Sequence, residues 1–423
     1  MKTLEQKEIK RDSQIKKFCM YGFLKDLRFF EPYLLVFLMA KGISIFEIGI
    51  LISIREIIVN VFEIPSGFIA DYFGRKKELC FAFTCYILSF VAFFFTNSFP
   101  LAIVAMIFFG LGEAFRSGTH KAMIYSYLNS KGWEKYKTFV YGRTRSFSLI
   151  GSAISSVLGI VLVLNVSAMN YIFLASILPY VLNFILILTY PKFLDSSEKS
   201  NNVSIKTAFK NFFLSFKNNK PLRTILVEEG MFSATISYIK DLIQPILEAI
   251  ILGSGIVLIS SLSEEDNLNV ILGIVYAILN LLGSLSSRSA YMVKGKKSNM
   301  LCLNIIHSLL AVSLLVLGIG NKNIYFVFAV YIVIYCLFNI RKPIFVDEID
   351  EHIEKFERAT ILSVSSQLKS LFLMIFAPLL GYIADKFGMN IIMYVLVGVF
   401  LLTLPLLWKK KKGWLLINQP FYF

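Results

Sequence analysis

Twelve apolar segments, each about as long as a bilayer is thick, constrain this 423-residue chain more than any other feature. Crossing the hydrocarbon core takes about 20 mostly apolar residues. Such segments lie near residues 18–40, 46–69, 79–96, 100–127, 140–164, 168–190, 226–252, 269–289, 299–318, 322–345, 359–384 and 389–408. Since 56% of all residues are hydrophobic and only 17% are charged, lipid must be the solvent for most of the surface. The sequence therefore predicts a multi-pass membrane protein.

The basic residues alternate along the chain in a way that predicts its orientation. Lys and Arg gather in residues 1–17, 75–77, 131–145, 191–225, 294–297, 341–358 and 409–412. The opposite segments hold only Lys41, Lys322 and Lys386. By the positive-inside rule, both termini are predicted to be cytoplasmic. This distribution accounts for the net charge of +15, and no nucleic-acid motif accompanies it, so nucleic acid is excluded as a partner.

The longest polar segment, residues 191–225, separates six predicted spans from six. We therefore expect two bundles that are joined by a cytoplasmic linker in a monomeric protein. The expected parts are a leader at 1–17, a six-helix bundle at 18–190, the linker at 191–225, a second six-helix bundle at 226–408 and a tail at 409–423. Parts of the linker are amphipathic and are expected to lie on the membrane surface.

A dense motif of glycines and charges, GFIADYFGRKK, follows the second predicted span at residues 67–77. Gly67 permits close approach of a neighbouring helix, and Gly74 permits a sharp turn. Asp71 can take a neighbouring helix N-terminus or Arg75 as its counter-charge. Together these residues favour a charged connection at the membrane face that can be made and broken.

This motif resembles the signature of the major facilitator superfamily, although Tyr72 stands where that family prefers a cation. The resemblance implies an all-α membrane protein with twelve transmembrane helices in two six-helix halves that rock about a midplane site. It also implies a conformational latch, which here would comprise Gly67, Asp71, Gly74, Arg75 and Lys76.

The fifth predicted span carries a glycine pattern that bears on the direction of transport. Gly142, Gly151 and Gly159 match three positions of an antiporter motif of this family, while Ser155 and Ser156 replace its Gly-Pro pair. The pattern favours export as the direction of transport. Glycines at this spacing are equally explained by ordinary helix packing.

Ionisable side chains lie inside several predicted spans, where each costs about 3 kcal/mol or more. The candidates for proton or substrate coupling are Glu56, Glu63, Glu113, Asp26 and Glu31. Their candidate charge partners are Arg28, Arg55, Arg116, Arg143 and Arg145. Structural ion pairing, such as Asp26 with Arg143 or Arg145, is the alternative. Since acids outnumber bases at mid-depth in spans one, two and four, a surplus acid can exchange a proton for a cationic substrate.

The second half offers fewer charged candidates. Lys240 and Asp241 lie in the seventh predicted span, and Lys369 lies in the eleventh. His307 stands alone in the ninth, where we expect a polar packing residue rather than a proton relay.

A closer resemblance concerns the pattern E-x-P-x5-D-x3-R-K that begins at Glu63. It is similar to the variant signature of the P-class tetracycline efflux proteins of anaerobic Gram-positive bacteria. Those proteins have a further membrane glutamate seven residues earlier, which here is Glu56. The resemblance implies a bacterial cell-membrane antiporter that exports tetracycline, as its divalent-metal (Mg²⁺) chelate, in exchange for protons.

Other functions fit the same scaffold. A multidrug or metabolite exporter and a proton-coupled nutrient importer are alternatives within transport, and a receptor or scaffold is the alternative outside it. The sequence has no G-x4-G-K-[ST] loop for ATP, so a proton gradient is the expected driving force. We expect no enzyme activity, no cofactor and no resident metal, and the expected partners are a small-molecule drug, protons and lipid.

Overall fold

The computed structural model describes residues 4–166, 168–195, 220–254, 258–294, 298–320, 323–350 and 358–408. The helices of the first part are α1 (Leu4–Arg11), α2 (Ser13–Lys25), η1 (Glu31–Tyr33), α3 (Leu34–Ala40), α4 (Ile45–Phe73), α5 (Arg75–Phe94), α6 (Phe99–Arg116), α7 (Thr119–Ser130), η2 (Glu134–Tyr136), α8 (Lys137–Asn165), α9 (Tyr171–Leu188) and η3 (Lys192–Leu194). Those of the second part are α11 (Lys220–Ser254), α12 (Glu264–Lys294), α13 (Asn299–Gly320), α14 (Ile324–Asp350), α15 (Arg358–Phe387) and α16 (Met389–Trp408). The described residues contain no strand.

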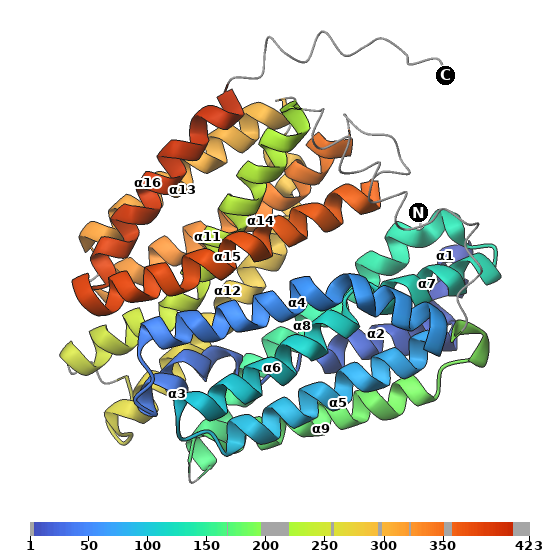
Figure 1. Cartoon of the computed structure of the whole chain (residues 1–423), viewed down its shortest axis with the longest axis horizontal. Coiled ribbons are helices and arrows are strands. Elements are labelled where there is room, and N and C mark those ends of the chain that lie inside the picture. Colours follow the sequence, from blue (N-terminus) through green and yellow to red (C-terminus); the bar gives the residue numbers. More distant parts are fainter. Residues whose placement is uncertain are drawn as a thin grey trace. The chain divides into compact units, whose positions relative to one another are not determined.

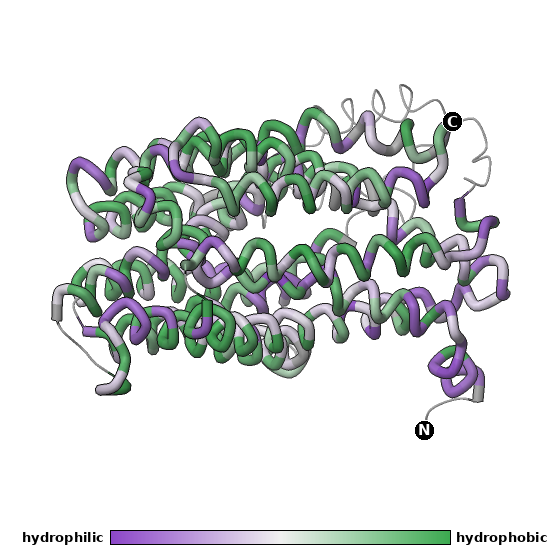
Figure 2. The backbone as a smooth tube through the Cα atoms, turned by 90° about the horizontal axis from the view of Figure 1, so that it is seen from below, coloured by the Kyte–Doolittle hydropathy of each residue, from purple (hydrophilic) through white to green (hydrophobic). Residues whose placement is uncertain are grey.

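Each of the twelve predicted apolar segments corresponds to helical structure (Figure 1). Eight helical stretches of the described chain are long and apolar enough to cross a membrane, while α4 and α11 are as long but carry several charged residues. Apolar residues prevail along the helices, and hydrophilic ones are concentrated near the N-terminus (Figure 2). The all-α membrane fold that the sequence predicts is therefore confirmed.

Contacts between Cα atoms divide the chain into two compact units. One consists of Met1–Ser200 and Leu247–Leu281, and the other of Asn201–Ile246 and Leu282–Phe423. In the first, α5 packs against α6 and α9, α4 against α6, and α2 against α8. In the second, α13 packs against α14 and α16. Most of the predicted linker and the whole predicted tail lie outside the described residues, so the predicted domain boundaries stay a prediction.

The first predicted span is not one helix, which corrects the expectation for residues 18–40. Helix α2 ends at Lys25, and regular structure resumes only with η1 at Glu31. Pro32 at the start of η1 has no N–H and a fixed φ, which suits the first turn of a helix and weakens a helix that would run through it. The backbone groups released by the break need other partners inside a membrane protein, and the Tyr180 hydroxyl donates to the Lys25 carbonyl at 2.9 Å.

Aromatic packing holds the broken segment in place. The Phe30 ring lies 5.2 Å from both Phe90 of α5 and Phe173 of α9, measured between ring centroids. On α3, Phe37 lies 4.9 Å from the same Phe173 ring. Such pairs contribute about 0.5–1.5 kcal/mol each beyond the area they bury. The break is thus fixed between α5 and α9, and its polar side chains are held in one place.

Candidate functional site

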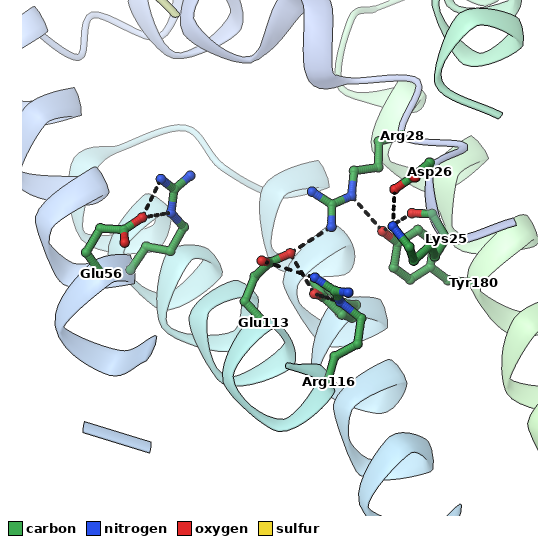
Figure 3. Close-up of polar contacts among 9 residues, drawn as sticks. Lys25, Asp26, Arg28, Glu56, Glu113, Arg116 and Tyr180 are labelled. Atoms are coloured by element: carbon green, nitrogen blue, oxygen red, sulfur yellow. Dashed lines mark hydrogen bonds and ion pairs between the residues drawn. The ribbon is translucent and has the colours of Figure 1, made fainter. Parts of the chain in front are cut away.

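The break in the first span brings a cluster of charged side chains together (Figure 3). Lys25 Nζ lies 2.7 Å from Asp26 Oδ1, next to the end of α2. The structure thus pairs Asp26 with Lys25, which the sequence analysis did not single out, and not with Arg143 or Arg145. Arg143 lies instead over the ring of Phe147, 5.6 Å from its centroid.

Arg28, two residues further along, joins the break to α6. Its Nη2 lies 2.7 Å from Glu113 Oε1, and its Nε donates to the Tyr180 hydroxyl at 2.9 Å. Arg116 Nη2 lies 3.3 Å from the other oxygen of Glu113, and Arg116 Nε donates to the Tyr86 hydroxyl at 2.9 Å. Tyr86 in turn donates to Glu113 at 2.7 Å. We call Arg28, Glu113, Arg116, Tyr86 and Tyr180 the first-half network.

The first-half network connects four segments of the chain, because its members come from the break, α5, α6 and α9. One carboxylate lies between two guanidinium groups, and its charged form is stabilised by all three donors that reach it. The three charged side chains are 17–26% exposed, so none of them is fully closed off from solvent. Arg28 and Arg116 have the chemistry to bind another anionic or polar group in place of Glu113.

Glu56 forms a second pair on α4, with the arginine next to it in sequence. Both Nε and Nη2 of Arg55 donate to Glu56 Oε1, at 3.0 and 2.7 Å. Glu56 is 8% exposed, whereas Glu63, two turns along the same helix, is half-buried. Glu31 is exposed at the start of η1. The three acids therefore differ in environment, and their roles in coupling stay predictions.

The predicted latch lies at the junction of α4 and α5. Gly74 has φ of 103°, a conformation that glycine adopts without strain, and it separates the two helices. Arg75 Nη1 donates to the Ser126 hydroxyl of α7 at 2.7 Å. Lys76 Nζ donates to the carbonyls of Leu188 and Tyr190, at 3.0 and 2.9 Å, at the end of α9. The side chains of the other two latch residues, Gly67 and Asp71, lie outside the described part.

Asp195 contacts the predicted latch, and the sequence analysis missed it. Its Oδ1 accepts from the backbone N–H of Lys76 at 2.7 Å, and its carbonyl accepts from the N–H of Arg75 at 3.2 Å. A carboxylate at a helix N-terminus satisfies free N–H groups and complements the helix dipole. A Cβ at Gly74 would meet Asp195 Oδ1 at 2.5 Å, so the glycine also makes room for this contact.

The glycines of α8 have a packing role at two of the three motif positions. A Cβ at Gly151 would meet the carbonyl oxygen of Phe23 at 2.4 Å, and one at Gly159 would meet that of Phe29 at 3.1 Å. A Cβ at Gly142 would meet nothing within 4 Å. The spacing thus lets α8 approach α2 and the break, and the packing explanation accounts for it without reference to the direction of transport.

The second unit contains a buried charged cluster that the sequence analysis did not assemble. Arg341, counted among the basic residues at 341–358 and lying at the end of the tenth predicted span, is 1% exposed within α14. It pairs with Glu228 and Glu229 of α11. Lys240, further along α11, lies over the rings of Tyr335 and Phe338 at 4.4 Å.

Neither set of charged residues resembles a metal centre. Among the residues that the structure describes, no three His, Cys, Asp or Glu side chains are grouped so that they could hold a metal ion.

Comparison with known proteins identifies the family. The family model described as Major Facilitator Superfamily matches residues 26–371. The chain belongs to the major facilitator superfamily. It is therefore a transporter and not an enzyme, and it is a multi-pass protein of the bacterial membrane.

Individual relatives agree with this membership. A protein of Bacillus subtilis strain 168, named "Uncharacterized MFS-type transporter YxaM", is 24% identical over 384 residues, which are 88% of this chain and 89% of that protein. Among solved structures, the nucleoside transporter NupG has a TM-score of 0.79 at 11% identity and covers 95% of this chain and 100% of its own. A D-xylose-proton symporter has a TM-score of 0.69 at 12% identity, covering 94% and 96%. These likenesses show the fold, and they give no support to the closer resemblance to tetracycline efflux proteins.

Proposed function

We propose that this facilitator is a proton-coupled antiporter that exports a small organic drug, with tetracycline, as its divalent-metal chelate, as the first cargo to test. The first-half network is the observation that carries the proton-coupled part of the proposal. It places a carboxylate and two guanidinium groups at a break in a membrane helix, which is where transporters of this fold class bind solutes and ions.

The proposed coupling uses the contacts of Glu113. Two guanidinium groups favour the ionised form of Glu113, so a proton would bind only in an arrangement in which one of them has moved away. A proton bound there would remove the negative charge that holds Arg28 and Arg116 together. Their repulsion would favour an arrangement in which the broken segment shifts relative to α6. Loss of the proton would restore the ion pairs and the starting arrangement. Proton binding would thereby bias the two states that alternating access requires.

Glu56 and Glu63 are proposed to bind a cationic cargo or a second proton. The two acids are seven residues apart on the continuous helix α4, so they lie toward the same side of it. The direction of transport and the choice of tetracycline rest on the sequence pattern around Glu63. A cationic chelate fits a site that offers carboxylates.

The experiment is transport into everted membrane vesicles that contain the full chain. Tetracycline with Mg²⁺, and ethidium as a second cation, are supplied outside, and uptake is followed with and without an uncoupler. We expect uptake of tetracycline that the uncoupler abolishes and that Glu113→Gln reduces at least tenfold. The matched control is Glu134→Gln, an exposed residue of η2, which should transport as the unchanged protein does. Uptake that persists with the uncoupler would contradict proton exchange, and full activity of both Glu56→Gln and Glu63→Gln would remove these acids from the mechanism.

Proton-coupled uptake of a polar solute is the second candidate. It is favoured by the similarity in fold to proteins named as a nucleoside transporter and a D-xylose-proton symporter. The hydroxyl groups of Tyr86 and Tyr180 beside Arg28 would suit a neutral polar solute. The vesicle orientation separates the candidates, because an importer accumulates nucleoside or pentose in right-side-out vesicles and gives no tetracycline signal in everted ones.

A further inference from the structure

Four ionisable side chains of the second unit form a buried cluster. Glu228 and Glu229 come from α11, His307 from α13 and Arg341 from α14, and their exposed fractions are 0%, 7%, 1% and 1%. We call these residues the second-half cluster. Because almost no surface of these side chains reaches solvent, their polar atoms depend on partners within the protein, and Arg341 Nε has no hydrogen-bond partner among the described residues.

The arginine of the second-half cluster is bound by both acids. Arg341 Nη2 lies 2.9 and 2.8 Å from the two oxygens of Glu228, and Nη1 donates to Glu229 Oε2. The other oxygen of Glu229 accepts from the Ser233 hydroxyl at 2.7 Å. The guanidinium carbon is 3.6 Å from the ring centroid of Phe232. Two carboxylates and one guanidinium give these three side chains a net charge of −1.

The hydrogen bonds of His307 fix where its protons must be. Nε2 lies 2.9 Å from the carbonyl oxygen of Phe400 on α16. A carbonyl oxygen can only accept, so Nε2 carries a hydrogen. The hydroxyl of Thr403, 3.3 Å from Nε2, is itself within donating distance of the carbonyls of Val399 and Phe400. A neutral imidazole with its hydrogen on Nε2 leaves Nδ1 as a bare acceptor.

That bare acceptor would face another acceptor. Nδ1 lies 3.2 Å from Glu228 Oε1, which as a carboxylate oxygen has no hydrogen to give. Two lone pairs at this distance repel, whereas one proton between them makes a charge-assisted hydrogen bond. With Nε2 donating to the Phe400 carbonyl, the geometry favours one proton more than neutral His307 and ionised Glu228 contain. The same proton brings the net charge of the second-half cluster from −1 to 0, which removes an uncompensated buried charge.

We propose that His307 and Glu228 form a proton-binding site, which holds one proton between Nδ1 and Oε1 in the state that the structure shows. The charged groups that face His307 are Glu228 from α11, through direct contact, and Arg341 from α14, through Glu228. From α16 it meets the carbonyl of Phe400 and the hydroxyl of Thr403, which do not titrate. This inference does not depend on the cargo or the direction proposed above, and it replaces the expectation that His307 only fills space.

Nitrogen-15 NMR of the histidine rings tests the site in the full chain, purified and placed in lipid nanodiscs. The chain has three histidines, so His120→Asn and His352→Asn variants assign the His307 signals. In the state that the structure shows, we expect both ring nitrogens of His307 to be protonated. His120, whose ring stacks on Tyr21 and contacts the Tyr190 hydroxyl, is the internal control and should give the signals of a neutral ring.

The decisive variant is Glu228→Gln. Glutamine keeps the shape of the side chain but carries no charge. The remaining charges of the cluster, on Glu229 and Arg341, then sum to 0, so no extra proton on His307 is needed for neutrality. His307 should then show one protonated and one bare nitrogen. Glu248→Gln, on the same helix α11, should leave the His307 signals unchanged.

Infrared difference spectra of the same samples detect a protonated carboxylic acid and so distinguish two further outcomes. If His307 is neutral and a protonated carboxylic acid band is present that Glu228→Gln removes, the proton lies on the Glu228 side of the same site, which supports the proposal. If His307 is neutral and no such band exists, the proposal is overturned. The protonation of the two His307 ring nitrogens is read in the protein with Glu228 intact, so that part of the test does not depend on whether Glu228→Gln folds.

Discussion

The charged residues of the two units differ in their solvent exposure. In the first-half network the charged side chains are 17–26% exposed, whereas Glu228, His307 and Arg341 of the second-half cluster are about 1% exposed. A solute can compete for partners that it can reach. A cluster closed to solutes can still gain or lose a proton, because a proton moves along hydrogen bonds. The two sets are therefore suited to different ligands.

The side chains of Arg28 and Glu113 should be energetically coupled. We expect Arg28→Gln and Glu113→Gln to destabilise the protein singly, since each leaves a charge without its partner, and the double variant to lose less than the sum. The coupling free energy should be about 0.5–3 kcal/mol, measured from unfolding of the purified protein. Strictly additive losses would show that the two side chains do not interact.

Asp195 should stabilise the start of α5. Asp195→Ala removes the acceptor for the Lys76 N–H, and we expect a loss of about 0.5–2 kcal/mol in the free energy of unfolding. Asp195→Asn keeps an oxygen in the same place and should recover most of that loss. An alanine variant as stable as the unchanged protein would mean that the contact contributes nothing.

One ion pair near in sequence was predictable, whereas the adjacent Lys25–Asp26 pair was missed and pairs far apart could not be predicted. The spacing of three between Glu113 and Arg116 indicated a shared helix face, and the structure has this ion pair. Arg28 and Glu113 are 85 residues apart, Lys76 and Asp195 are 119 apart, and neither contact leaves a local signal. For Arg341, the positive-inside rule counts the basic residue and does not indicate that Glu228 and Glu229 of another helix pair with it.

At the scale of elements, the helices follow from apolar segment length, but the break in the first span does not. Pro32 and the nearby charges indicated a loosened backbone, yet they could not show that the helix stops at Lys25 and restarts at Glu31. The end of α2 depends on Tyr180 and the aromatic rings of α5 and α9, which the fold brings together. Tertiary contacts decide the break, so it could not be derived from local sequence.

The close packing of α8 against α2 can be tested with two glycines of α8, one that packs closely and one that serves as the control. Gly151→Ala places a methyl group against the backbone oxygen of Phe23, which cannot move without shifting a helix, and should cost about 1–3 kcal/mol. Gly142→Ala on the same helix meets nothing and should be neutral or stabilising by up to about 1 kcal/mol. Thermal unfolding in detergent compares the two. Equal stability of both variants would contradict the packing role.

At the scale of the whole molecule, the family and the fold agree with the sequence prediction, and the orientation in the membrane stays to be measured. The five cysteines are free, so a cysteine-free background can be made and single cysteines added. Asn97→Cys, in the exposed turn between α5 and α6, should react with a membrane-impermeant maleimide in intact cells. Lys131→Cys, beyond α7, should react only after the membrane is opened. The reverse pattern would place the termini outside.

The sharing of charges between helices also limits how such a sequence can evolve. A change at Arg28 alone leaves Glu113 with one guanidinium, and a change at Arg341 alone leaves Glu228 and Glu229 buried beside each other without their shared guanidinium. Each first step is unfavourable, although the paired change is tolerable. Lineages should therefore keep these residues together or replace them together, and the members of each set should be gained and lost as units among related transporters.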